Sequence, residues 1–367
     1  MTQSAYLCFI VALTISSILP CKAQYIYTER DFKSDTLSTA QVDLIIKNTK
    51  QHSIIGLGEA DHLKGTFYRI KSQLVRELIL QNHFDLLLLE ADMNTCLQLN
   101  KYIKGDTTIH LNQLLPEMNA TNNYILHNVY NTPEIDALLN WIKAYNTSYN
   151  NKITLAGIDF QHPQHLGNVI KNYLPQALQS ELADVVNVYS KYYHDYMDYK
   201  NIFRIYTADS LKKEAATAAG KVQHISNYLG KNEDKYLQAN LASLVCMSGF
   251  FTDPNGIVYR DTTMFNNLCL QIGTHKAMIW AAAQHLQESN TISGQYWMGA
   301  YIRRKWNQQY CNIGIYGPLD CMPAPVKDNT IALELLVNNA TSNCLQNNNE
   351  SIIISVKAKT IPYATVL

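Results

Sequence analysis

The chain has 367 residues, of which 47% are hydrophobic and 16% charged, which is enough for one large globular domain or for a domain with a sizeable insertion. Thirty basic residues balance thirty acidic ones, so no overall field attracts nucleic acid or an anionic membrane. This composition excludes a disordered or fibrous chain and favours a soluble enzyme or binding protein without a nucleic-acid partner.

Residues 1–23 have the pattern of a signal peptide. The apolar run 6–19, at about 14 residues, is short for a membrane span, and it is followed by Pro20 and the small-residue site Cys21-Lys22-Ala23. We therefore expect a mature domain over 24–367, exported to the periplasm or outside the cell. Lipid attachment at Cys21 is the alternative, which Pro20 disfavours. No later segment is expected to span a bilayer.

Short apolar runs further along the chain predict buried strands. They lie at 54–57, 86–89, 153–158, 277–280 and 312–316, with further candidates at 331–337 and 352–356. Between the first two, apolar residues recur at helical spacing, which makes a strand–helix–strand unit. The sequence therefore predicts an α/β fold with a mainly parallel central sheet flanked by helices. The interval of about 164–259 lacks such strands, and we expect it to form a helical insertion that caps the active-site cleft.

Polar residues follow four of these runs where each predicted strand ends. They are Glu59 and His62, Glu90 and Asp92, Asp159 and Gln161, and Gln284 and His285. Because ligands of parallel sheets bind beyond the carboxyl ends of the strands, we expect these groups to converge on one crevice. Several buried charges in one place must pair with each other or take part in chemistry.

Six segments resemble the erythromycin esterase family in order and spacing, from about residue 54 to residue 316. They are LGEADH with FYRIKSQLVREL, FDLLLLEAD, GIDFQ, RDTTMFNN and IWAAAQH. The resemblance implies an α/β core with a helical cap. It also implies hydrolysis of the macrolactone ester of macrolides by water that the histidine of G-E-x-x-H activates. Here that histidine is His62, with Glu59 beside it, and no cofactor is expected.

The chemistry is consistent with the residue types. An imidazole takes a proton from water near neutral pH, and a neighbouring carboxylate stabilises the imidazolium. No G-x-S-x-G sequence is present, so we expect direct attack by water on a small-molecule ester rather than a serine nucleophile. A metal-dependent hydrolase is an alternative, with His62, His285 and either Glu59 or Glu90 as ligands.

Further residues are assigned from the resemblance, each with a structural alternative. The family shows arginine at the positions of Lys71 and Arg76, which are therefore expected to bind substrate or to lie just behind it. Glu90 and Asp159 match acidic positions, as catalytic groups or as buried ion-paired ones. Arg260 and Asp261 are expected to form a structural ion pair. Tyrosines at near-helical spacing in the cap, including Tyr196 and Tyr199, either pack its core or line the substrate site.

One departure from the family concerns the segment WAAAQH. Where the family commonly shows W-A-H-N-x-H, this chain has Ala282 and Ala283 and keeps only His285. If the missing imidazole binds the oxyanion in the family, the rate of hydrolysis here falls by about 10² to 10³. A binding protein that has lost the chemistry is therefore the second alternative.

The cysteine spacing is compatible both with a disulfide between Cys311 and Cys321 and with buried free thiols.

Overall fold

The computed structural model describes residues 36–59, 62, 65–117, 129–150, 152–160, 162–197, 209–230, 232–252, 257–288 and 296–316, and the backbone of 24–25 and 351–355. The side chains of 193–197, 257, 258 and 316 are not among those described. The expected signal peptide, the candidate strand 331–337 and Cys321 therefore lie outside the described residues. Export, the domain division and the Cys311–Cys321 bridge stay predictions.

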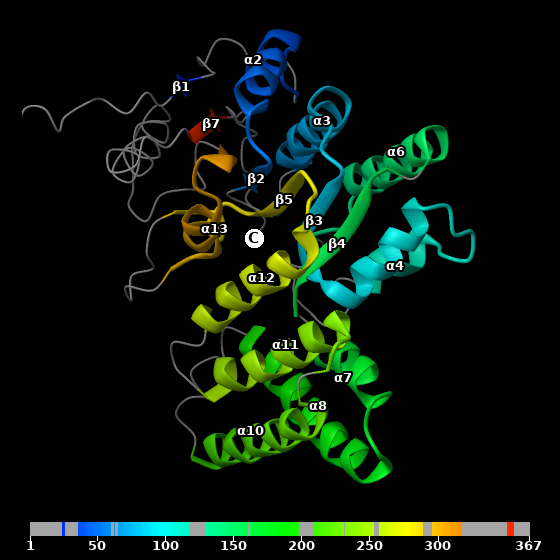
Figure 1. The fold of residues 1–367 in the computed structure, drawn as a ribbon, viewed down its shortest axis with the longest axis vertical. Helices are drawn as coiled ribbons and strands as arrows, with labels where there is room; N and C mark the ends of the chain where they lie inside the picture. The colour runs from blue at the N-terminus through cyan, green and yellow to red at the C-terminus, as the bar shows by residue number, and fades with distance from the viewer. Residues whose placement is uncertain are drawn as a thin grey trace, which may run out of the picture.

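The centre of the fold is a parallel sheet with the strand order β1-β7-β6-β2-β5-β3-β4 (Figure 1). The strands are β1 (Gln24–Tyr25), β2 (Ile54–Glu59), β3 (Leu86–Asp92), β4 (Thr154–Asp159), β5 (Ala277–Ala282), β6 (Tyr310–Tyr316) and β7 (Ser351–Ser355). All five predicted strands and the later candidate at 352–356 are present, which confirms the expected α/β class.

Helices cover both faces of this sheet, which is why its strands are apolar on both sides. One core lies under α2 (Thr39–Thr49), α3 (Gly65–Asn82), α4 (Met93–Ile103) and α6 (Pro133–Tyr149), and the other under α12 (Ile257–Ile272) and α13 (Met298–Trp306). The short elements α5 (Leu111–Glu117) and η1 (Asn307–Gln309) complete this part. Strands β2 and β3 are buried along their whole length, so they hold their last residues rigidly.

Local sequence signals fix where several of these helices begin. Ser38 and Gln41 form a capping box at the start of α2. The Asp92 side chain accepts a hydrogen bond from the backbone N–H of Thr95 at the start of α4. Strand β3 therefore ends in a carboxylate that also caps the next helix, which places α4 directly beyond the carboxyl edge of the sheet.

The described part of the segment between β4 and α12 consists of helices and the short turns that join them. It contains α7 (Pro163–Lys171), α8 (Gln176–Met197), α10 (Asp209–Leu229) and α11 (Lys235–Thr252), which share a separate hydrophobic core. These helices form the lower body in Figure 1, and α11 packs against α12. Tyr189 and Tyr192 are fully buried in that core, so these two members of the tyrosine series pack the helical body. Among the described helices, none combines the length and apolarity that crossing a bilayer requires.

Candidate active site

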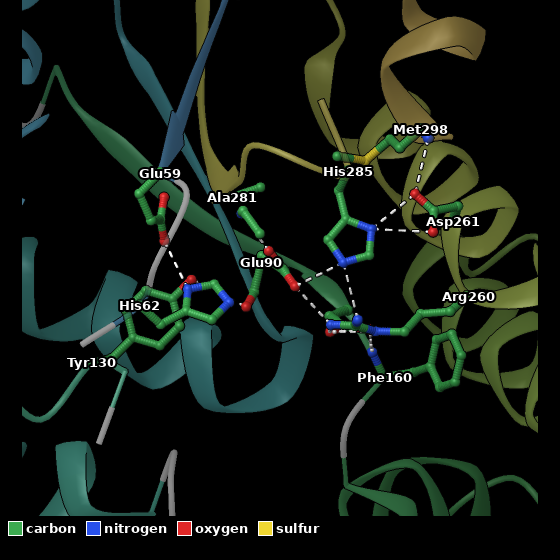
Figure 2. A network of polar contacts seen from close by, with 12 residues as sticks. Glu59, His62, Glu90, Tyr130, Phe160, Arg260, Asp261, Ala281, His285 and Met298 are labelled. Atoms are coloured by element: carbon green, nitrogen blue, oxygen red, sulfur yellow. Dashed lines mark hydrogen bonds and ion pairs between the residues drawn. The ribbon is translucent and has the colours of Figure 1, made fainter. Parts of the chain in front are cut away.

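Strands β2, β5, β3 and β4 are consecutive neighbours, so their carboxyl ends meet at one edge of the sheet. That edge carries Glu59, Glu90 and Asp159, and His285 follows β5 just beyond it. Figure 2 shows that Glu59, His62, Glu90 and His285 point toward one another, and Arg260 joins Asp159 to Glu90. The structure thus brings together the five residues that the sequence predicted as catalytic.

Glu59 binds two basic side chains, one at each carboxylate oxygen. Its Oε1 lies 2.8 Å from Nδ1 of His62, and its Oε2 accepts a hydrogen bond from Nζ of Lys71. Lys71 is fully buried, and its Nζ lies 4.3 Å from the ring centroid of Trp280. Burial lowers the pKa of Lys71 to about 8, although the charge of Glu59 opposes this. Lys71 therefore fixes Glu59 from inside the protein and is a positioning residue, which agrees with the second of the two expected places, just behind the substrate.

His62 is the accessible member of this group, with 35% of its side chain exposed. Since Glu59 can only accept, Nδ1 of His62 donates and Nε2 is left for proton exchange. Desolvation lowers the pKa of His62, but the hydrogen bond to Glu59 and the charges of Glu59 and Glu90 outweigh it, so the pKa is raised above 6.5. In Figure 2 the imidazole lies between the two glutamates.

Glu90 is the centre of a second, more deeply buried group. Its Oε1 accepts from Nη2 of Arg260 at 2.8 Å and lies 3.2 Å from Nε2 of His285, and its Oε2 accepts from the backbone N–H of Ala282 at 2.7 Å. Burial raises the pKa of Glu90, yet the charges of His285 and Arg260 keep it well below its ordinary value. Tyr130 also donates to the Glu90 backbone carbonyl at 3.0 Å. This carboxylate is fixed and ionised.

His285 is held at both ring nitrogens. Nδ1 lies 2.9 Å from Oδ1 of Asp261, while Nε2 lies 3.2 Å from Glu90 and 3.1 Å from Nη1 of Arg260. Burial lowers the pKa of His285, but the charges and hydrogen bonds of Glu90 and Asp261 raise it to about 10. His285 is therefore an imidazolium at neutral pH. It supplies positive charge to the site and is not available as a base.

Arg260 and Asp261 do not pair with each other, contrary to the expectation. Arg260 binds Asp159 through Nε and Nη2, at 3.2 Å and 2.6 Å from Oδ2, whereas Asp261 binds His285 and accepts from the backbone N–H of Met298 at 2.9 Å. Consecutive residues of a helix point about 100° apart, so neighbours in sequence on α12 reach different partners. Arg260 thereby links the ends of β3 and β4.

Arg76 is placed at a different surface, which corrects the prediction that it binds substrate in this crevice. It lies on α3 facing α6, where its Nη2 donates to the Ala137 carbonyl at 3.4 Å and its guanidinium lies 5.4 Å from the ring centroid of Trp141. There it lines a surface hollow of about 500 Å³ between α3 and α6. The reason is helix phase, because Lys71 and Arg76 are five residues apart and lie on different faces of α3.

The remaining predicted site residues lie outside the cluster or outside the described residues. Tyr196 belongs to α8, but its side chain is outside the described residues, as are Tyr199 and Gln161. Gln284 is exposed. Their roles as substrate contacts stay predictions.

Two contributors were not foreseen from the sequence. Tyr130 was not singled out, because no periodic pattern surrounds it and its link is to a backbone carbonyl. The pairing of Lys71 with Glu59 joins residues twelve positions apart across the turn from β2 to α3. The resemblance had drawn attention to Lys71, but its partner depends on how α3 packs against the sheet.

The side chains suggested as metal ligands are already engaged with other protein groups. Among the described residues, no three or more His, Cys, Asp and Glu side chains are arranged to hold a metal ion. Both nitrogens of His285 already face protein groups, and Glu90 is engaged by a guanidinium and a backbone N–H. These residues do not offer the free lone pairs that ligands need.

Comparisons with known proteins agree with the fold. Three solved structures share the fold. A Bacillus cereus protein aligns with TM-score 0.57 and 22% identity over 78% of this chain and 72% of its own. A succinoglycan biosynthesis protein aligns with TM-score 0.58 and 18% identity over 83% and 76%. A mutant of the erythromycin esterase EreC in its open conformation aligns with TM-score 0.54 and 17% identity over 77% and 74%. The comparison with curated proteins found no match.

The family comparison covers more than half of the chain. Residues 79–317 match the family Erythromycin esterase. The matched segment contains Glu90, Asp159, Arg260 and His285, while Glu59, His62 and Lys71 precede it. The interpretation of the Glu59–His62 pair therefore rests on its geometry in this chain. By the extent of this match, the chain belongs to the erythromycin esterase family.

Proposed function

We propose that this hydrolase of the erythromycin esterase family cleaves a carboxylic ester with water that His62 activates. The observation that carries the proposal is the Glu59–His62 pair. A carboxylate that is 1% exposed orients an imidazole that is 35% exposed, at the carboxyl edge of a parallel sheet. His285, in contrast, is 7% exposed and has both ring nitrogens engaged.

In the proposed reaction, Nδ1–H of His62 stays bonded to Glu59 while Nε2 takes a proton from water. The water oxygen bonds to the ester carbonyl carbon, and the carbonyl becomes an oxyanion. The cationic His285 and Arg260 supply positive potential for this charge. When the carbon–oxygen bond to the leaving group breaks, the alkoxide takes the proton back from His62, which restores the base and releases acid and alcohol.

Electroneutrality supports this assignment of roles. Four carboxylates, Glu59, Glu90, Asp159 and Asp261, face three cations, Lys71, Arg260 and His285. Protonation of His62 brings the group to zero net charge, so the imidazolium that forms during catalysis is stabilised. Desolvation lowers the pKa of His62, and the net rise comes from Glu59 and Glu90, the two carboxylates nearest to the ring.

The substrate class comes from similarity and is proposed as such. The structural relative EreC is named an erythromycin esterase, and a macrolactone ester is the first substrate to try. Ala282 favours a second candidate, a binding protein with impaired catalysis. Its side chain has no polar atom, and its backbone N–H donates to Glu90.

We also propose that the protein is exported. The test is N-terminal sequencing of native material: a sequence that begins near Gln24 would support export, and an intact Met1 would contradict it.

The test is an assay of p-nitrophenyl esters, together with mass spectrometry of a macrolide panel, on the wild type and on His62→Ala. We expect hydrolysis that His62→Ala reduces by about 10² to 10⁴ and that a chelator leaves unchanged. A matched control is His275→Ala. His275 also pairs with a carboxylate, Asp85 at 2.9 Å, but precedes β5 at the opposite end of the strand.

Two outcomes decide between the candidates. Activity that survives His62→Ala excludes water activation by His62. If the wild type is inert and Ala282→His with Ala283→Asn creates activity, the binding protein is the better description.

A further inference from the structure

A second carboxylate–imidazole pair lies at the same edge of the sheet. Nδ1 of His165, in the first turn of α7, lies 2.9 Å from Oδ1 of Asp92 at the end of β3. Thr95 adds a contact from its Oγ1 to the same nitrogen at 3.3 Å. The His165 ring also stacks on His162, with centroids 4.7 Å apart. The ring is therefore fixed from three sides.

This pair has nearly the same construction as the Glu59–His62 pair. In each, a strand-end carboxylate that is 1% exposed holds Nδ1, at 2.8 Å for His62 and 2.9 Å for His165. In each, about one third of the imidazole is accessible, 35% for His62 and 32% for His165. His285, by contrast, is 7% exposed. His165 therefore has the access to a ligand that His285 lacks.

Asp92 itself is not explained by packing. It is 2% exposed, and among the described residues its Oδ2 has no hydrogen-bond partner. A buried carboxylate with an unsatisfied oxygen is costly, so its presence at a sheet edge that binds ligands calls for a functional explanation. Capping α4 needs only the other oxygen, Oδ1.

Contacts connect this pair to the site already described. Asp92 is the cross-strand partner of Asp159, and Asp159 binds Arg260, which in turn contacts Glu90 and His285. From β2 through β5 to β3 there are two strand spacings, so Asp92 lies roughly 10 Å from Glu59 along the edge.

We propose that His165, held by Asp92, is a further substrate-binding residue of this active site and contacts a hydroxyl group of the substrate roughly 10 Å from the scissile ester. A hydroxyl suits Nε2 of His165 because it both donates and accepts, whichever protonation state the ring has. The substrate is then an extended or bulky hydroxylated ester. The inference rests on the proposed function for the position of the ester.

The kinetic test compares two esters that differ only in the hydroxyl, p-nitrophenyl 8-hydroxyoctanoate and p-nitrophenyl octanoate. Extended, the terminal hydroxyl of the first reaches roughly the required distance of two strand spacings. We expect the wild type to favour the hydroxylated ester about tenfold in kcat/KM, through KM, as one well-made hydrogen bond allows. His165→Ala should reduce this ratio to about one, and His165→Gln should restore part of it.

The control variant is His224→Ala. His224 forms the same kind of pair, with Glu181 at 2.9 Å, but on the exposed surface of the helical body. It should leave the ratio unchanged. A ratio that survives His165→Ala overturns the proposal, and so does an equal loss on both esters, which is the signature of a merely structural role.

A binding experiment separates this proposal from the proposed function. The amide 8-hydroxyoctanamide is titrated into the protein while the imidazole signals of His165 are followed by NMR, with octanamide as the reference. Shifts at His165 that need the hydroxyl support the site even if the wild type hydrolyses no ester. Unmoved His165 signals overturn it even if hydrolysis by His62 is established.

Discussion

His62 and His285 stand at neighbouring strand ends, bind carboxylates at similar distances and are nevertheless suited to opposite roles. His62 has one nitrogen on Glu59 at 2.8 Å and keeps 35% of its side chain exposed, while His285 has both nitrogens engaged and keeps 7%. Both pKa values are raised, but only that of His285 is raised to about 10. The comparison teaches that the number of carboxylate partners and the access of water, not the residue type, decide which imidazole can act as a base.

The strongest way to break this comparison is to remove the single carboxylate partner of His62. Glu59→Gln should lower kcat/KM by about 10² to 10⁴, because an amide does not stabilise the imidazolium or fix the tautomer. A base works when deprotonated, so wild-type activity should rise with pH through an apparent pKa above 6.5. In Glu59→Gln this limb should move to lower pH. A pH–rate profile measures it, and an unmoved limb contradicts the role of Glu59.

For the buried imidazole of the comparison, the substitution His285→Ala should mainly lower the free energy of unfolding. It leaves Glu90 and Asp261 buried with fewer cations, and breaking a buried pair costs about 3 to 5 kcal/mol. His62→Ala, at a partly exposed position, should change the free energy of unfolding by no more than about 0.5 kcal/mol. Urea unfolding of both variants measures the difference. Equal losses would show that the two imidazoles share one role.

The pH dependence of stability sharpens the same contrast. Because the folded-state pKa of His285 is about 10 against an ordinary value of 6.5, its contribution is fully present below pH 6.5. That contribution is lost as pH rises through the folded-state pKa of about 10. The wild-type unfolding midpoint should therefore fall between these two values more steeply than that of His285→Gln. Parallel curves would mean that His285 is neutral in the folded protein.

The smallest effect concerns the buried cation behind Glu59. In Glu59→Gln the fully buried Lys71 loses the carboxylate that raises its pKa against burial. Its ammonium group is then buried without a partner or gives up its proton, so the double change with Lys71→Met should be more stable than the single one. The expected gain is about 1 to 4 kcal/mol, since removing both members of a buried pair is often tolerated. Thermal unfolding of the two variants decides it. A double variant that is less stable would show that Lys71 packs usefully without its charge.

Much of the fold was predictable because its strands are short, continuous apolar runs in the sequence. Runs such as 54–57 and 86–89 are apolar on both faces, and the structure buries them completely, as a sheet covered on both sides requires. Parallel pairing then follows from the helix between them, and it places Glu59, Glu90 and Asp159 at one edge. These carboxylates were identified from the sequence because each directly follows a buried strand.

Helical residues were less predictable, and the errors share a cause. The ion pair of Arg260 with Asp261 was expected from their adjacency in sequence. The shared role of Lys71 and Arg76 was expected from the resemblance. The structure instead directs Arg260 to Asp159, Asp261 to His285 and Arg76 to α6. A strand has a period of two and a fixed edge, whereas the direction of a helical side chain depends on the rotation of the whole helix against the sheet.

The sequence by itself thus determined the strands, their parallel direction and the five polar residues that end or follow them, because burial on both faces leaves a plain apolar signal. Only the tertiary structure decided which cation meets which carboxylate. It made His285 an imidazolium, placed Lys71 behind Glu59, and put His165 on Asp92 from a helix more than seventy residues away in the chain. Such partners are chosen by the packing of α3, α7 and α12 against the sheet edge, and the free energy of burying a charge then enforces the pairing.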